Sequence, residues 1–417
     1  MKILWFSTSP SNAAEEFGYD HLGCGWIASL ETIISQSEQF ELGICFFYEG
    51  DKYKKIIKNN TTYYGIPLPK LNSISRIIHR HLGKLNDEYD SPYFEKVIEE
   101  FKPNLIHVFG TENGYGKILI NKFDKVVFHL QGLMEPITNV FYPATITKHQ
   151  SLLNDNFGNI IRGLTPFHTY KSFISRATRE KKIIRHFKYF SGRTTCDRNY
   201  IRLLNENATY FHCEEFLRPI FFNAQWEPAN AMLDKKKIKI ATTINPNIYK
   251  GLDLIYRVLS LLDNKDIEWN IFGMHENNPL NSIIKKSLEL ERNEKIVFHG
   301  PVRAEALVEH LKQCDFFIHP SYIDNSPNSV CEAMLLGMPV LASSVGGMNS
   351  LIKHNENGFL FNPYDAYELA GLILDLSIDY NKALDAGKKA RATALKRHDA
   401  KSIEESISNM YKSIIES

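Results

Sequence analysis

Residues 315–342, DFFIHPSYIDNSPNSVCEAMLLGMPVLA, have the pattern of a strand, a helix and a second strand. Asp315–His319 and Pro339–Ala342 are short apolar runs with little alternation, which is typical of strands buried on both faces of a parallel sheet. Asn328–Leu336 lies between them and has the length of a crossover helix. A strand–helix–strand unit of this kind predicts an α/β fold.

The alternation of strands and helices continues through the second half of the chain. Further strands are predicted at Lys237–Thr243, Glu268–Phe272, Lys295–His299 and Gly358–Phe361, and further helices at Lys250–Leu262, Leu280–Glu291, Arg303–Gln313, Met348–Lys353 and Asp365–Leu376. This alternation indicates a doubly wound parallel sheet. Ligands of such sheets bind outside the carboxyl ends of the strands, so we expect functional residues in the loops that follow them.

The first half has the same character with less regular spacing. Its strands are predicted at Lys2–Ser7, Phe40–Tyr48, Asn104–Phe109, Lys125–Leu130 and Ala208–His212. The chain has 417 residues, whereas a single hydrophobic core rarely grows past about 250–300 residues. We therefore predict two α/β domains at residues 1–222 and 237–400, joined by a linker at 223–236 and followed by a helix at 401–417.

Composition and charge exclude several classes of protein. Lysine and arginine number 49 and aspartate and glutamate 48, a balance that argues against a dedicated nucleic-acid binder. The six cysteines form no Cys-x-x-Cys pair, so neither a zinc ribbon nor a thioredoxin-like site is expected. The N-terminus lacks the apolar stretch of a signal peptide, and no window approaches the length of a membrane span. We therefore predict a cytoplasmic protein.

The segment between the two strands of residues 315–342 carries the most informative polar groups. Asp324 and Glu332 are two carboxylates with seven residues between them, and both could hold hydroxyl groups of a polyol ligand. Asn325 or Ser326 suits the cap of the following helix, and Pro327 suits its first turn. The peptide N–H groups of the next two residues, Asn328 and Ser329, would then face a polar or anionic ligand. The alternative is structural, with Asp324 in a turn and Glu332 satisfying backbone donors.

The segment resembles the donor-binding signature of retaining nucleotide-sugar glycosyltransferases of the GT-B fold, and more narrowly of glycosyltransferase family 4. That family has two acidic residues with seven between them, then Ala-Met, and here these are Asp324, Glu332 and Ala333-Met334. The family usually has Glu at the first acidic position. Pro320-Ser321, Gly337–Val340 and Gly346-Gly347 also fit its pattern. The resemblance implies two Rossmann-like domains facing a cleft, with the C-terminal helix packing back on the first.

The resemblance assigns donor-binding roles to further residues. In the family, a lysine at a helix start and an arginine a few residues earlier neutralise the diphosphate; here the lysine is Lys250, and Asn245 stands nearest to the arginine's place. Gly23 and Gly25 resemble the glycine-rich loop at which the backbone approaches the phosphate or the acceptor. Asn325, Ser326, Asn328 and Ser329 line the start of the helix beneath the nucleotide sugar. A simple tight turn is the alternative for the two glycines, and a surface lysine is the alternative for Lys250.

Candidate residues in the first half lie near two strand ends. The family often has a histidine directly before a glycine here, in contact with the transferred sugar; Gln131 holds that place, and His129 lies two residues back. Both side chains would point to the same face of a continuing strand, so either could reach the sugar. The alternative for His129 is a core histidine. Arg193 resembles an element on the acceptor side, and we interpret Arg218 as an ion-pair partner between the domains.

The implied reaction moves a hexose from a UDP- or GDP-sugar to a hydroxyl of a saccharide or lipid-linked saccharide, as in bacterial polysaccharide or glycolipid synthesis. Lys250 and helix N–H groups would stabilise the departing diphosphate, so no metal ion is expected. Asp324 would orient the sugar, and Glu332 would hold the ribose. No obvious nucleophile for a double displacement is present, which favours attack on the same face as the leaving group.

Two other functions remain open from the sequence. A nucleotide-sugar 2-epimerase would use the same scaffold, and a non-catalytic partner subunit would bind the nucleotide and transfer nothing. Two basic stretches, at residues 75–84 and 171–188, could lie on an anionic membrane, which would place the protein at its inner face. The alternative for both stretches is a solvated helix face.

Overall fold

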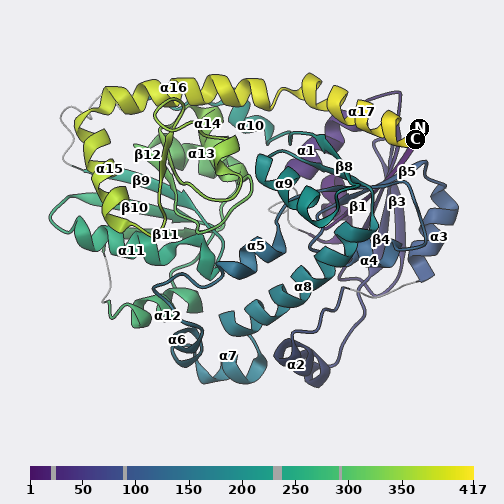
Figure 1. Ribbon diagram of the computed structural model, residues 1–417, viewed down its shortest axis with the longest axis horizontal. Helices are drawn as coiled ribbons and strands as arrows, with labels where there is room; N and C mark the ends of the chain where they lie inside the picture. The colour runs from purple at the N-terminus through teal and green to yellow at the C-terminus, as the bar shows by residue number, and fades with distance from the viewer. Residues whose placement is uncertain (20–24, 88–91, 229–236, 291–293) are drawn as a thin grey trace. The chain divides into compact units, whose positions relative to one another are not determined.

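The computed structural model describes residues 1–19, 25–87, 92–228, 237–290 and 294–417. The chain divides into two compact units, and each is built from more than one segment (Figure 1). Unit 1 comprises Met1–Glu135, Ser172–Leu217 and His398–Ser417, and unit 2 comprises Pro136–Lys171 and Arg218–Arg397.

These units differ from the predicted boundaries, most of all in residues 136–171 and in the predicted linker. Residues 136–171 lie in the first half of the sequence but belong to unit 2, where Thr145 Oγ1 donates a 2.5 Å hydrogen bond to Asp253 Oδ2. Trp226, within the predicted linker, is buried and donates from its indole nitrogen to the carbonyl of Cys314 at 2.8 Å. The described part of that linker, up to residue 228, is therefore anchored on unit 2. Both contacts join residues far apart in sequence, which local patterns do not reveal.

Unit 1 is built on an eight-stranded sheet with the order β3-β4-β2-β1-β5-β6-β7-β8. All neighbouring strands are parallel except β3 and β4, which form an antiparallel hairpin. The strands are β1 Lys2–Ser7, β2 Glu41–Tyr48, β3 Lys54–Lys58, β4 Thr61–Pro67, β5 Leu105–Phe109, β6 Val126–His129, β7 Tyr189–Gly192 and β8 Thr209–His212. The hairpin turns at Asn59 and Asn60, which both have positive φ angles, a conformation that asparagine tolerates well.

Helices cover both faces of this sheet and enclose two apolar cores. They are α1 Gly25–Ile34, α3 Pro92–Phe101, α4 Tyr115–Leu119, α8 Pro166–His186, α9 Thr195–Leu204 and α17 Ala400–Glu416. A further helix of unit 1, α2 Ser73–Leu82, has no buried residue. Helix α5 (Met134–Asn139) begins in unit 1 and ends in unit 2. Helix α8 begins in unit 2 and ends in unit 1. The layered arrangement of helices on a parallel sheet confirms the predicted Rossmann-like architecture of the first half.

The C-terminal helix α17 packs on the sheet of unit 1, as predicted (Figure 1). Its Tyr411 is fully buried, and the phenol oxygen lies 3.1 Å from Trp5 Nε1 and 2.7 Å from His107 Nδ1. One hydroxyl therefore joins the last helix to strands β1 and β5. His107 is also fully buried, as a core residue of β5.

Tyr411→Phe is expected to lower the free energy of unfolding by about 2 kcal/mol, because two buried ring nitrogens lose their shared partner. Urea unfolding followed by tryptophan fluorescence measures the change. Tyr210→Phe is the control, since its hydroxyl makes only a long 3.3 Å bond to the carbonyl of Thr194. An equal loss of stability in the two variants would contradict the role assigned to Tyr411.

Unit 2 is built on a six-stranded, fully parallel sheet with the order β11-β10-β9-β12-β13-β14. The strands are β9 Ile238–Thr243, β10 Ile267–Phe272, β11 Ile296–Gly300, β12 Phe316–His319, β13 Val340–Ser343 and β14 Phe359–Phe361. The helices are α6 Lys148–Leu153, α7 Phe157–Arg162, α10 Pro219–Asn223, α11 Leu252–Leu261, α12 Pro279–Ser287, α13 Ala304–Lys312, α14 Asn328–Leu336, α15 Ala366–Ile378 and α16 Tyr380–Arg397.

The order of strands in unit 2 confirms the predicted doubly wound sheet. Helices α6, α7, α10 and α16 were not predicted, and the predicted helices differ mainly at their ends. The predicted helix at Lys250–Leu262 begins instead at Leu252, after a 3₁₀ turn over Ile248–Lys250. The predicted helix at Met348–Lys353 is a 3₁₀ turn over Met348–Ser350. Within the described residues, no helix has the length and apolar composition that crossing a bilayer requires.

Candidate functional site

Three charged or titratable side chains meet at the carboxyl ends of β9 and β12 in unit 2. Asp324 Oδ2 accepts a hydrogen bond from Lys250 Nζ at 2.6 Å and lies 3.0 Å from His319 Nε2. His319 ends β12, Asp324 lies in the loop after it, and Lys250 follows β9 in the chain. The structure thus brings together two of the predicted catalytic residues, Lys250 and Asp324, at the edge where α/β sheets bind ligands.

Two glycines allow the loops to come close enough to form this cluster. Gly251 has a φ of +81°, and a Cβ atom there would lie 2.1 Å from the carbonyl oxygen of Pro320. Gly346 has a φ of +52°, and its Cβ would lie 2.0 Å from the carbonyl oxygen of Asp324. In both places a side chain would collide with backbone that cannot easily move, so only glycine fits without rearrangement.

The electrostatics of the cluster keep Asp324 ionised. Burial on its own would raise the pKa of this carboxyl, but Lys250 and the hydrogen bond from His319 outweigh it and hold the pKa well below its usual range. Burial also lowers the pKa of His319, against the opposing effect of Asp324. His319 was missing from the predicted site, although its place as the last residue of an apolar strand was a usable signal.

The predicted cap of helix α14 is wrong in its position. Neither Asn325 nor Ser326 is the N-cap of the helix; Pro327 holds that position, and it has no side-chain capping hydrogen bond. Both residues are nearly buried, and the backbone N–H of Asn325 donates to Asp324 Oδ1 at 3.0 Å. Asn328 and Ser329 form the first turn and are half-buried. Their donor-binding roles stay predictions.

Glu332 lies on α14 and is paired with Arg218. The Nε and Nη2 atoms of Arg218 each lie 2.7 Å from one carboxylate oxygen, a bidentate arrangement. Glu332 is 5% exposed, and burial raises the pKa of its carboxyl while Arg218 opposes the rise. The predicted ion pair of Arg218 is therefore present, but it lies within unit 2 and not between domains. A bound ribose would have to donate its hydrogen bonds to carboxylate oxygens that already accept from the Arg218 guanidinium.

Asn245, Gly23 and Gly25 were the remaining predicted donor contacts. Asn245 is exposed just after β9 and accepts a 2.8 Å bond from Asn247 Nδ2. Gly23 lies outside the described residues. Gly25 begins α1 with a φ of +36°, and a Cβ there would meet no described atom within 4 Å. Asn245 and Lys250 hold the two positions at which the family neutralises the diphosphate. Because the amide of Asn245 is neutral, only Lys250 of this pair carries a positive charge.

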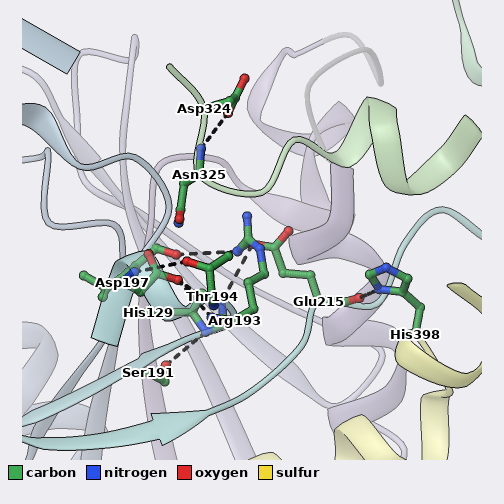
Figure 2. Close-up of polar contacts among 10 residues, drawn as sticks. His129, Ser191, Arg193, Thr194, Asp197, Glu215, Asp324, Asn325 and His398 are labelled. Carbon is green, nitrogen blue, oxygen red and sulfur yellow. Dashed lines mark hydrogen bonds and ion pairs between the residues drawn. The ribbon is translucent and has the colours of Figure 1, made fainter. Parts of the chain in front are cut away.

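Unit 1 has a second buried polar cluster, at the carboxyl ends of β6 and β7 (Figure 2). His129 is fully buried; its Nδ1 lies 3.0 Å from Ser191 Oγ, and its Nε2 lies 3.7 Å from Glu215 Oε1. No described group makes a hydrogen bond to Nε2. His398 Nδ1 lies 2.8 Å from the backbone carbonyl oxygen of Glu215 and ties the start of the C-terminal segment to this cluster.

Arg193, predicted for the acceptor side, is buried in an ion pair with Glu215. Its backbone N–H donates to Asp197 Oδ2 at 3.0 Å, and Asp197 also closes the capping box of α9 with Thr194. These contacts assign Arg193 a structural part in unit 1. Gln131, two residues beyond the end of β6, is half-buried. Groups of three or more residues suited to a metal ion are absent from the described part of the chain.

Burial, helped by the positive charge of Arg193, lowers the pKa of His129 to about 3. The folded state therefore holds this imidazole neutral, whereas the unfolded chain takes up a proton below pH about 6.5. We expect the free energy of unfolding to fall as the pH drops from about 6.5 toward 3, with a slope near 1.4 kcal/mol per pH unit from this group.

The measurement is urea unfolding at several pH values between 4 and 7, comparing the chain with His129→Gln. The variant should lose most of that slope, because the glutamine does not titrate. An unchanged pH dependence in His129→Gln would contradict the assignment.

The segment around Lys250, Asp324 and Glu332 is also the part of the chain that matches a known family. Residues 227–393 match the family of glycosyl transferases group 1. The match covers most of unit 2, including the cluster at β9 and β12. It confirms the predicted resemblance at the level of this family.

The curated relatives of the chain include proteins named as glycosyltransferases. The amylovoran biosynthesis glycosyltransferase AmsK of Erwinia amylovora is 30% identical over 139 residues, which cover 31% of this chain and 33% of AmsK. The N,N'-diacetylbacillosaminyl-diphospho-undecaprenol alpha-1,3-N-acetylgalactosaminyltransferase of Campylobacter jejuni is 27% identical over 186 residues, covering 45% of this chain and 47% of the relative. The matched stretches span about half or less of the length of these relatives.

Solved structures match over nearly the whole chain. Sucrose-phosphate synthase of Thermosynechococcus elongatus has a TM-score of 0.72 at 14% identity and covers 99% of this chain and 98% of its own. HepE of Anabaena, solved with UDP and glucose, has a TM-score of 0.63 at 16% identity and covers 99% and 100% of the two chains. With its two Rossmann-like units, the chain has the GT-B fold that the sequence predicted.

Proposed function

We propose that this protein is a retaining glycosyltransferase that moves a hexose from a nucleoside diphosphate sugar to a hydroxyl acceptor. The observation that carries the proposal is the Lys250–Asp324–His319 cluster, which lies at the ligand-binding edge of a unit that matches glycosyl transferases group 1. The HepE structure contains UDP and glucose, which supports a UDP-sugar as the first donor to test, with a GDP-sugar as the second.

In this proposal unit 2 holds the donor. The Lys250 ammonium balances the charge that develops on the leaving diphosphate, and the start of α14 offers its N–H groups as a second source of positive potential. Asp324, kept ionised by its two partners, accepts hydrogen bonds from hydroxyls of the transferred sugar. Glu332 holds the ribose and shares its oxygens with Arg218. Fixed protein charges take the part that a metal ion plays in other transferases, so transfer should proceed without added metal.

The bond between the anomeric carbon and the diphosphate oxygen breaks, and a bond forms from the acceptor oxygen to the same face of the sugar. The acceptor proton passes to the departing phosphate oxygen. This route needs no protein nucleophile and keeps the anomeric configuration. His129 is a catalytic candidate only if Nε2 gains access to the sugar, since it is fully buried in unit 1.

The acceptor we propose is a saccharide or a lipid-linked saccharide of a bacterial polysaccharide or glycolipid. The support is the set of named activities among the curated relatives, one of which acts on a diphospho-undecaprenol carrier.

The test is calorimetry of the full chain with UDP-, GDP- and ADP-sugars, followed by mass spectrometry and NMR spectroscopy of products with saccharide and lipid-linked acceptors in the presence of EDTA. One donor should bind, and its sugar should appear on an acceptor with retained configuration. Release of an epimerised nucleotide sugar would contradict transfer, and so would tight donor binding without any product across the acceptor panel.

A further inference from the structure

Helix α2 of unit 1 presents an apolar stripe to the outside. Ile74, Ile78 and Leu82 recur at intervals of four residues and therefore share one face of the helix. Their exposed fractions are 72%, 48% and 61%, which are high values for large apolar side chains. All ten residues of α2 are described, and none of them is buried. The helix lies away from the eight-stranded sheet (Figure 1).

The opposite side of α2 is basic. Arg76 and Arg80 each lie two helical positions from Ile78, which places them about 160° around the helix from the apolar stripe. Lys70 and Lys84 flank the helix, and the sequence from residue 70 to residue 84 contains no aspartate or glutamate. Lys70 reaches across to Asp51. Helix α2 thus combines an apolar face with a polar face that is rich in arginine, the pattern of helices that lie in a membrane interface.

Helix α2 is capped at both ends. The side chain of Asn72 caps the first turn by accepting from the backbone N–H of Ser75 at 2.7 Å. Gly83 ends the helix with a φ of +65° and donates its N–H back to the last turn. His79 Nδ1 lies 2.7 Å from Asn86 Oδ1 and joins the helix to the following loop. The apolar stripe is therefore presented by a formed helix.

The second basic stretch, residues 171–188, differs from α2 in where its apolar side chains point. Ile183, Ile184 and Phe187 are buried in a core of unit 1. Arg179 is also nearly buried and pairs with Asp87 in two hydrogen bonds. Ile174 of this stretch is 44% exposed, but it is a single exposed side chain. The structure therefore separates two stretches that the sequence could not distinguish, because α2 exposes its whole apolar stripe, whereas most apolar side chains of residues 171–188 are buried or half-buried.

We propose that α2 docks on the surface of an anionic lipid bilayer. Ile74, Ile78 and Leu82 enter the boundary between head groups and acyl chains, and Arg76, Arg80 and Lys84 remain at the level of the negatively charged head groups. Charge complementarity favours a lipid surface over a second copy of this chain, whose α2 would bring a like-charged segment opposite it. The inference does not depend on the proposed sugar transfer.

The experiment is co-sedimentation of the full chain with vesicles of phosphatidylcholine, with and without phosphatidylglycerol. The chain should sediment with the anionic vesicles and lose binding as salt is raised. The triple variant Ile74→Ser, Ile78→Ser, Leu82→Ser should bind about tenfold less. The charge variant Arg76→Gln, Arg80→Gln, Lys84→Gln should bind both kinds of vesicle equally weakly.

A matched control removes equally exposed apolar side chains elsewhere. Leu203 and Ile378 are 83% and 86% exposed on α9 and α15, and the double variant Leu203→Ser, Ile378→Ser should bind like the unchanged chain. The proposal is overturned if the chain stays in the supernatant with anionic vesicles, if neutral vesicles bind it as well, or if the control loses as much as the triple variant.

Size-exclusion chromatography tests whether the apolar stripe instead joins two copies of the chain. A dimer that dissociates in the triple variant, without vesicle binding, would assign the stripe to a second copy and overturn the lipid proposal. Transfer to a water-soluble acceptor without vesicles should be equal in the unchanged chain and the triple variant. Failure of docking and failure of the proposed function are therefore told apart.

Discussion

Lys250→Ala is expected to lower kcat/KM for sugar transfer by about 10²–10³-fold, the usual cost of removing one fixed group that stabilises developing charge. The ammonium lies 2.6 Å from Asp324 at the carboxyl ends of β9 and β12, where the diphosphate is proposed to bind. Asn245 carries no charge and cannot replace it. Product formation by mass spectrometry over a range of donor concentrations gives the two kinetic constants.

Two further variants test whether the loss of activity comes from the positive charge at this position. Lys250→Arg keeps the charge with a different shape and should retain more activity than Lys250→Ala. Lys312→Ala removes a half-buried lysine that pairs with the exposed Glu309 on α13 and should leave transfer unchanged. Circular dichroism confirms that each variant is folded. Full activity in folded Lys250→Ala would remove this residue from the proposed mechanism.

Arg193→Met is expected to lower the free energy of unfolding of unit 1 by about 3–5 kcal/mol, because it leaves a buried carboxylate without its partner. Arg193 and Glu215 are 5% and 1% exposed, so water cannot take the place of the guanidinium. Urea unfolding followed by fluorescence measures the loss. His129 also lies beside Glu215 and should titrate at a higher pH in this variant, since the positive charge that depresses its pKa is gone.

The double variant Arg193→Met, Glu215→Leu is the control. It removes both charges, so most of the stability lost in Arg193→Met should return. A double variant as unstable as the single one would mean that Arg193 acts through its other contacts, with Asp197 and the carbonyl of Leu130. The acceptor role predicted for Arg193 would gain support if Arg193→Met were stable but inactive.

Local patterns were sufficient for the strands of the second sheet and for β1, β2, β5, β6 and β8 of the first, but not for β7. The apolar strand Phe316–His319 and the helix Asn328–Leu336 could be located because apolar runs and helical periodicity are patterns of neighbouring residues. The antiparallel hairpin of β3 and β4 was not predicted. Helix ends were predicted least accurately, because a cap depends on one or two hydrogen bonds. The N-cap of α14, for example, is Pro327 and not Ser326 or Asn325.

Local patterns also predicted one part of the candidate site and missed the other. Asp324, Glu332 and Lys250 stand in recognisable local patterns, but their partners come from distant positions in the chain. Arg218 is more than 100 residues from Glu332, and His319 joins Asp324 only because the loop folds back on the end of β12. The burial of His129 and Arg193 likewise depends on Glu215 and the C-terminal segment.

The sequence by itself determined the alternation of strands and helices, the two α/β halves and the carboxylate pair that resembles a sugar-nucleotide site, because each is written in residues close together along the chain. Only the tertiary structure decided that residues 136–171 belong to the second unit, that Glu332 is shared with Arg218, and that α2 rather than the stretch 171–188 exposes an apolar face. Those properties follow from which surfaces bury one another, and burial is a property of the folded chain that no short segment encodes.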